Sequence, residues 1–539
     1  MKRWSLFVGL GAVLAVAAVG LSASASAKEQ APDQQEPTGR LVIAVPGDPE
    51  GLDPATTYIF GWEVAANIYS FLVGNGVNYA RNSYVPTKHA SDLVQSWSVS
   101  RRDNTITLRL NPRATFSDGA PVTAEDVRYT LQRGLQGNLG FTKIQYAVGN
   151  LASMRQVQVV NSRTIRLRYP QGLNRFSLAN LTHQLFGVVK KTYVESGATS
   201  ADPWGGRLLA QKPLGSGPYT LASWRPGESV LLRARSGYWG QPKPTYAEIE
   251  YRIIPNSQTR ALLLRSGEVD VAYDLSPEQL RQAASEADLR VLSVPAPQDT
   301  LAFRMNPAEA PFDDLNFRRA IIKAIPYGEI IRGAVRGFGT RIKSPCGISA
   351  QGYRSYSLYE TNLRQARAFL ARSKYASGAR FTLILPNANP SVVTAVQMIQ
   401  SSLRRIGITM DIRALPAAAY NAQLQRSGAP VNVHAMSPAF NDCLYWAYWM
   451  FTSNSPTNYI RYSNRALDRQ VRAALNVAPD NTRRYNALIN SVITNILVGD
   501  AVVAPLYQVH MTVAAKRNVD RLVFWPYRGI QWKYARPAR

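Results

Sequence analysis

The stretch Phe116–Arg133, FSDGAPVTAEDVRYTLQR, carries the most specific structural signal in this 539-residue chain. Asp118 and Gly119 form a dipeptide that is typical of tight turns. Thr123 precedes a helical pattern and is followed three positions later by Asp126, an arrangement close to a capping box. The stretch therefore predicts a turn followed directly by a helix that begins after Thr123.

Outward from this stretch, the apolar periodicity alternates between strand and helix patterns. Strands are predicted over 40–45, 104–110, 157–160, 164–169, 219–224, 229–234, 248–254, 380–385 and 408–413, and short strands over 501–539. Helices are predicted over 62–73, 257–266, 315–336 with a break at Pro326, 361–373, 391–406, 420–427, 465–475 and 480–498. The strand–helix–strand order over 380–413 is an α/β unit.

Composition limits the classes of protein that the chain can belong to. Its 46% hydrophobic and 18% charged residues are typical of a globular protein, and its length predicts two to four domains. Two cysteines and four dispersed histidines exclude a disulfide-dense fold and argue against a metal cluster. The net charge of +27 is spread without a basic block, so we expect no nucleic-acid partner. Salt-dependent attraction to an envelope polyanion remains an alternative.

The N-terminus has the pattern of a secretory signal peptide. Lys2 and Arg3 precede the apolar run Trp4–Leu21, and Ala25-Ser26-Ala27 forms a small-x-small cleavage site. We predict a signal peptide over 1–27, a polar linker over 28–38, and export to the periplasm or cell envelope. An uncleaved membrane anchor is the alternative.

The cysteines and the catalytic motifs bear on covalent chemistry. In an oxidising compartment Cys346 and Cys443 can form a disulfide, and two buried thiols are the alternative. The chain has no G-x-S-x-G and no H-E-x-x-H motif. We therefore expect no enzymatic activity, with a secreted hydrolase as the alternative, and we predict no cofactor and no metal.

Several segments together resemble one protein family. They are Leu52-Asp53-Pro54, Phe116–Arg133, PLGSGPYTLASWRPGESVLLR (213–233), GYWG (237–240), SGEVDVAY (266–273), PFDDLNFRRAIIKAI (311–325), YSNRALD (462–468) and APLYQV (504–509). In this order and spacing they resemble the extracellular solute-binding proteins of bacterial peptide/nickel-type ABC importers. The resemblance spans about 40–539, nearly the whole mature chain.

The resemblance implies an α/β, two-lobe periplasmic-binding-protein fold of the large class II type. It places lobe I at 39–78, 212–297 and 505–539, an inserted subdomain at 79–211, and lobe II at 298–504. It implies a monomer that captures a peptide or peptide-like solute between closing lobes and delivers it to ABC permease transmembrane subunits. An oligosaccharide, an opine or a metal chelate is the alternative ligand.

The family's ligand contacts map onto ten positions of this chain, which are Tyr58, Phe60, Tyr273, Asp274, Asp299, Phe303, Asn441, Asp442, Trp446 and Tyr507. Core packing is the alternative role for the aromatic positions. The strip over 436–446 departs from the family, because Phe440 stands where peptide binders have the aspartate that pairs with the peptide's amino terminus. Asp442 can serve only after a two-residue shift, so an α-amine anchor is in doubt. The aromatic residues of the strip instead suit stacking on an apolar, aromatic or sugar face.

Overall fold

The structure is a computed structural model that describes residues 36–57, 59–386, 389–436, 440–478, 480–525 and 529–538. The predicted signal peptide and residues 28–35 of the predicted linker lie outside the described residues. Within the described part of the chain, no helix is both long enough and apolar enough to cross a membrane.

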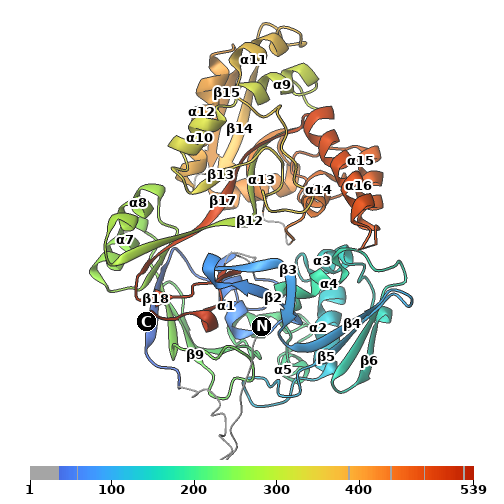
Figure 1. Cartoon of the computed structure of the whole chain (residues 1–539), viewed down its shortest axis with the longest axis vertical. Coiled ribbons are helices and arrows are strands. Elements are labelled where there is room, and N and C mark those ends of the chain that lie inside the picture. The colour runs from blue at the N-terminus through green and yellow to red at the C-terminus, as the bar shows by residue number, and fades with distance from the viewer. Residues whose placement is uncertain are drawn as a thin grey trace, which may run out of the picture. The chain divides into compact units, whose positions relative to one another are not determined.

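One mixed sheet passes through the molecule. Its strands follow the order β15-β14-β16-β12-β17-β11-β1-β10-β9-β8, with β13 paired to β17. The strands are β1 (Arg40–Val45), β8 (Tyr219–Arg225), β9 (Ser229–Ala234), β10 (Glu248–Ile253), β11 (Val271–Tyr273), β12 (Leu289–Met305), β13 (Gly339–Arg341), β14 (Arg380–Pro386), β15 (Thr409–Leu415), β16 (Val431–Met436) and β17 (Val503–Lys516). The long antiparallel strands β12 and β17 run from one half of this sheet to the other (Figure 1). The chain passes between the two halves, named lobe I and lobe II below, through these two strands.

Lobe I is our name for the half that contains β1 and β8–β11. It carries α1 (Ile59–Ile68), α7 (Ser257–Ser266) and α8 (Pro277–Ser285), together with the terminal strands β18 (Val519–Asp520), β19 (Phe524–Trp525), β20 (Gly529–Ile530) and β21 (Arg536–Pro537). A four-stranded sheet joins β19 and β20 to β2 (Val73–Asn78) and β3 (Ser83–Ser91). Gly267 has φ +82° and ends α7, as the sequence predicts.

The inserted subdomain lies between β3 and β8 in the chain. It contains β4 (Val94–Ser100), β5 (Thr105–Leu110), β6 (Val157–Asn161), β7 (Thr164–Arg168), α2 (Ala124–Gln136), α3 (Thr142–Val148), α4 (Phe176–Ala179), α5 (Lys191–Ser196) and α6 (Gly206–Gln211). The capping box that begins α2 is present: Thr123 Oγ1 accepts the Asp126 N–H at 3.3 Å, and Asp126 Oδ2 accepts the Thr123 N–H at 2.9 Å. Apolar residues of the same stretch, including Phe116 and Leu131, lie in the core of this subdomain.

Lobe II is our name for the half that contains β14–β16. Its helices are α9 (Leu315–Ala324), α10 (Tyr327–Gly333), α11 (Leu363–Leu370), α12 (Pro390–Arg404), α13 (Ala417–Ser427), α14 (Cys443–Phe451), α15 (Arg465–Leu475) and α16 (Thr482–Thr494). The break at Pro326 and the α/β unit of β14, α12 and β15 are as predicted. The two-lobe α/β fold is confirmed, whereas the residue limits proposed for the lobes stay a prediction.

Two predicted elements are wrong. The helix predicted over 62–73 ends at Ile68, because the Gly217 N–H donates to the Ile68 carbonyl and Gly215 lies against the same carbonyl. Tyr69, Phe71 and Leu72 lie in the connection that follows, and Val73 begins strand β2. Of the short strands predicted over 501–539, the first is a long strand of 14 residues, β17, because pairing with β12 extends it.

Candidate functional site

Groups from lobe II and from the inserted subdomain meet at Asp442, the residue directly before α14. Asp442 caps this helix, and its Oδ1 accepts the Leu444 N–H at 2.8 Å. Arg175, directly before α4 in the inserted subdomain, donates from Nε to Asp442 Oδ2 at 3.3 Å. The hydroxyl of Tyr485, on α16, donates to Asp442 Oδ1. One carboxylate therefore receives donors from lobe II and from the inserted subdomain.

This ion pair is largely shielded from water. The exposed fraction of the side chain is 12% for Arg175 and 7% for Asp442. The Arg175 guanidinium carbon lies 3.9 Å from the ring centroid of Tyr485, which adds a cation–π contact. Burial raises the pKa of Asp442, while the Tyr485 hydroxyl, the Arg175 charge and the Leu444 N–H act in the opposite direction. Each charge depends on the other, because a buried charge without a partner is costly.

Aromatic side chains form a second layer of contact between the same two parts. Phe176 stacks on Phe440 with ring centroids 4.9 Å apart and planes 12° apart, and it meets Tyr445 edge-on at 5.8 Å. The Tyr445 hydroxyl donates to Gln145 Oε1. We use the name interlobe contact for the set Gln145, Arg175, Phe176, Phe440, Asp442, Tyr445 and Tyr485. It joins helices α3 and α4 to α14 and α16, which Figure 1 places opposite each other.

A loop of lobe II fixes the position of Asp442. A disulfide joins Cys346 to Cys443, the residue that follows Asp442. Asn441 Nδ2 donates to the Ser349 carbonyl at 3.0 Å and to Ser349 Oγ at 3.1 Å. Bonds on both sides of Asp442 therefore tie it to residues 346–349, so its carboxylate is held in place before any ligand arrives.

One of the positions predicted in lobe I, Tyr273, contacts a different carboxylate, that of Glu63. The Tyr273 hydroxyl donates to Glu63 Oε2 at 2.8 Å, and the Tyr251 hydroxyl donates to Glu63 Oε1 at 3.1 Å. The ring of Phe60 packs edge-on against Tyr251 at 5.0 Å. Burial raises the pKa of Glu63 to about 7. Asp274 is exposed beside this cluster, with φ +48°.

The remaining predicted positions are not at the interlobe contact. Phe303, Trp446 and Tyr507 are 0%, 1% and 3% exposed and belong to the core of lobe II. Tyr58 and the side chain of Asp299 lie outside the described residues. Of the ten predicted positions, Asp442 belongs to the interlobe contact, and Asn441 precedes it and bonds to Ser349 within lobe II. The role of all ten as ligand contacts stays a prediction.

Sequence reasoning missed the partner of Asp442. Arg175 is the only Asp, Glu, Lys or Arg between Arg168 and Lys190. This isolated position in the sequence could have identified it as a residue that pairs with a distant carboxylate. A lone charge in an uncharged stretch needs a partner from elsewhere in the chain. The sequence around Gln145 or Tyr485 has no comparable pattern that would have predicted their place at the interlobe contact.

Other features of the described residues lie apart from this site. Among them, no group of three or more His, Cys, Asp or Glu side chains is placed to hold a metal ion. A surface pocket of about 600 Å³ lies on lobe II, lined by residues of α9 and α11 that include Lys323 and Phe369. It shares no residue with the interlobe contact. The interlobe contact remains the better candidate, because a site between lobes can respond to their movement.

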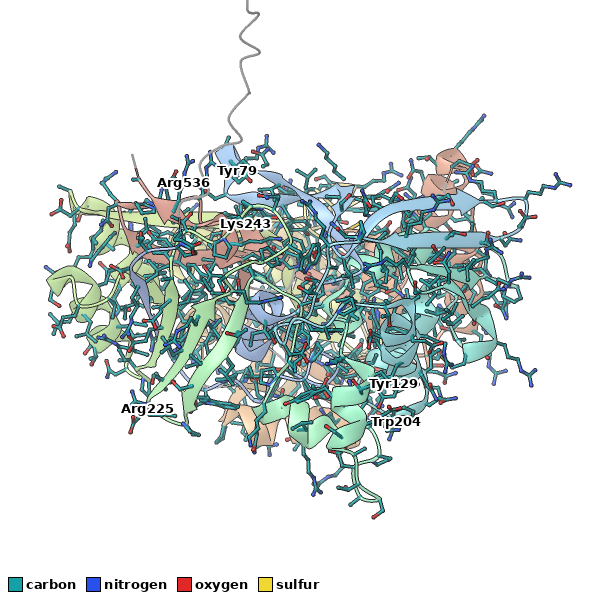
Figure 2. The ribbon with its side chains drawn as sticks, turned by 90° about the horizontal axis from the view of Figure 1, so that it is seen from below. Tyr79, Tyr129, Trp204, Arg225, Lys243 and Arg536 are labelled. Atoms are coloured by element: carbon teal, nitrogen blue, oxygen red, sulfur yellow. A yellow bond between two sulfur atoms is a disulfide. The ribbon has the colours of Figure 1, made fainter. Side chains whose placement is uncertain are left out.

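Buried polar contacts also fix the inserted subdomain to lobe I. Arg133 on α2 donates from Nη2 to Asp53 Oδ2 at 2.8 Å, from Nη1 to Asp53 Oδ1 at 3.3 Å, and from Nε to the Trp204 carbonyl at 2.9 Å. Tyr129 lies beside Trp204 with ring centroids 6.3 Å apart (Figure 2). Asp53 and Arg133 belong to two of the quoted family segments, and the structure shows that these segments bind each other.

Known proteins resemble the chain over most of its length. The model of the bacterial extracellular solute-binding proteins, family 5, matches residues 88–458. The probable D,D-dipeptide-binding periplasmic protein DdpA of Escherichia coli K12 is 27% identical over 495 residues, which cover 91% of this chain and 92% of that protein. The glutathione-binding protein GsiB of Salmonella paratyphi A is 26% identical over 404 residues, 73% of this chain and 76% of that protein.

A solved structure shows the same fold. The periplasmic binding protein DppA of Helicobacter pylori, in complex with the peptide STSA, superposes with a TM-score of 0.79 at 23% identity. The match covers 93% of this chain and 98% of that protein.

Proposed function

Because the chain belongs to the family 5 bacterial extracellular solute-binding proteins, we propose that it captures a peptide or peptide-like solute between its lobes for an ABC importer. The observation that carries the proposal is the interlobe contact, in which buried polar and aromatic groups of both parts meet around Asp442. Such a contact can form fully only when the parts are together. A ligand that binds between them stabilises that arrangement, and the difference in affinity between open and closed states drives closure.

The relatives support the finer parts of this proposal. DdpA and GsiB carry dipeptide-binding and glutathione-binding names, and both names describe small peptides or peptide-like solutes. The proposed location is outside the cytoplasmic membrane, where the predicted signal peptide directs the chain. The proposed partners are the transmembrane subunits of an ABC permease, which read the closed form of a monomer.

The proposed role is binding without turnover. Its test is native mass spectrometry of the mature protein purified from its host, followed by gentle denaturation and identification of the released solute. The expected result is a set of peptides or one peptide-like compound, recovered chemically unchanged after incubation with fresh protein. A released oligosaccharide or metal chelate would move the ligand to another class, and sustained conversion of the solute would make the protein an enzyme.

A further inference from the structure

Most of the acceptor capacity of Asp442 is already used by the protein itself. Its Oδ1 accepts the Leu444 N–H and the Tyr485 hydroxyl, and its Oδ2 accepts the Arg175 Nε. A buried carboxylate is the natural partner for the α-ammonium group of a peptide. Here the positive charge next to it is supplied by Arg175. A ligand ammonium brought to this carboxylate would meet the guanidinium and the repulsion of like charges.

The unsatisfied buried groups at α14 are mainly hydrogen-bond donors. Among the described residues, Arg175 Nη1 and the indole Nε1 of Trp449 are buried without a hydrogen-bond partner, as is the Nε1 of Trp446 in the core of lobe II, away from the interlobe contact. One acceptor next to α14, the Oδ1 of Asn441, is also buried without a hydrogen-bond partner among the described residues. Trp449 also reaches the inserted subdomain, with its ring 6.1 Å from that of Phe141. Buried donors without partners are rare in proteins, so a group that fits here would supply acceptor oxygens.

We propose that the solute presents carbonyl or carboxylate oxygens to Arg175 at this end of the site and carries no free α-ammonium group there. The inference rests on the proposed function and names the class of solute within it. N-blocked peptides and acidic peptide-like compounds belong to this class. Arg175 is then a specificity-determining residue: it binds the acceptor and excludes the ammonium, and Asp442 positions it through the ion pair.

The test compares one pool of synthetic di- to pentapeptides in two forms, with free amino termini and after N-acetylation. Dissociation constants are measured by native mass spectrometry and checked by calorimetry for the tightest members. Wild type is expected to bind acetylated members at least about tenfold more tightly than their free counterparts, because a free ammonium leaves buried donors unpaired. Arg175→Met removes the cation and frees Asp442, so its preference is expected to turn toward free amino termini.

Two further variants serve as controls. Arg175→Lys keeps a cation beside Asp442 and is expected to keep discriminating against free amino termini. Arg101→Met removes a different ion pair between the inserted subdomain and lobe II, that of Arg101 with Asp480, in which both side chains are 55% exposed. Because that pair is solvated, its loss is expected to leave the preference of the wild type unchanged.

The outcomes separate the inference from the function on which it rests. Wild-type protein that binds free and acetylated peptides equally, or prefers the free form, overturns the role of Arg175 and leaves the peptide-binding function intact. Wild-type protein that binds neither pool overturns the peptide-binding function and the inference with it. If Arg175→Met does not fold, the affinities of wild type and Arg175→Lys for the two peptide pools still test the role of Arg175.

Discussion

Two buried Asp–Arg pairs in the described part of the chain differ in how completely their hydrogen-bonding groups are satisfied. In the pair of Asp53 with Arg133, all three guanidinium nitrogens donate hydrogen bonds, and both partners are less than 3% exposed. In the pair of Asp442 with Arg175, Nε donates at 3.3 Å and Nη1 has no partner among the described residues. The first pair joins α2 to the Leu-Asp-Pro turn, and the second joins the inserted subdomain to lobe II.

This difference separates a bond of the folded framework from a bond of the closed state. The Asp53–Arg133 pair, between lobe I and its inserted subdomain, has no guanidinium nitrogen left to offer a ligand. A pair that spans two parts and leaves a donor unused can open with the lobes and can accept a further partner. We therefore assign stability to Asp53–Arg133 and specificity to Asp442–Arg175.

The largest expected effect comes from breaking the satisfied pair. Asp53→Asn leaves the Arg133 charge buried and unpaired, which should lower the free energy of unfolding by about 3–5 kcal/mol. Asp442→Asn should cost less than half of that, because the lobes can separate and Arg175 can then reach water. Chemical denaturation of the ligand-free proteins measures both values. Equal losses in the free energy of unfolding for the two variants would show that the Asp442–Arg175 pair stabilises the fold as much as the Asp53–Arg133 pair does, which would contradict the distinction drawn between them.

A smaller effect is expected at a third buried carboxylate, Glu63, whose donors are neutral. They are the hydroxyls of Tyr251 and Tyr273 and the N–H of Ile530 at 3.0 Å. Burial raises its pKa from the ordinary value of 4.5 to about 7, so between these values the folded protein holds a proton that the unfolded chain has lost. The stability that Glu63 contributes is therefore complete below pH 4.5 and is lost as the pH rises through 7.

Glu63→Gln removes this titration. Between pH 4.5 and 7 the unfolding free energy of wild type should fall relative to the variant, by at most about 3 kcal/mol. Denaturation curves of both proteins at several pH values measure the difference, and groups shared by the two proteins cancel. A difference that is constant with pH would mean that Glu63 is ionised throughout this range.

Local signals in the sequence were sufficient for most individual elements. The capping box of Thr123 and Asp126 and the glycine that ends α7 depend on residues close in the chain, so they could be predicted. The end of α1 could not be predicted, because the groups that stop it at Ile68 come from the loop around Gly217. No strand was predicted where β12 lies, since Pro295 and Pro297 interrupt its apolar pattern and pairing with β17 maintains it.

The candidate site was predicted only partly, for the same reason. Asp442 was found because it lies in a strip that the family uses, and Asn441 lies next to it. Arg175 is 267 residues away from Asp442 in the sequence, and only the fold brings the two together. Whether this strip anchors an α-amine stays a prediction, and under the proposal above the Arg175 guanidinium beside Asp442 is what opposes such an anchor.

The central claim is that a solute closes the lobes onto the interlobe contact, and small-angle X-ray scattering tests it most directly. The mature protein is measured alone and with a saturating amount of the tightest-binding peptide from the two pools. We predict a smaller radius of gyration with the peptide than without it. An unchanged radius of gyration at saturation, with binding verified by calorimetry in the same samples, would contradict the claim.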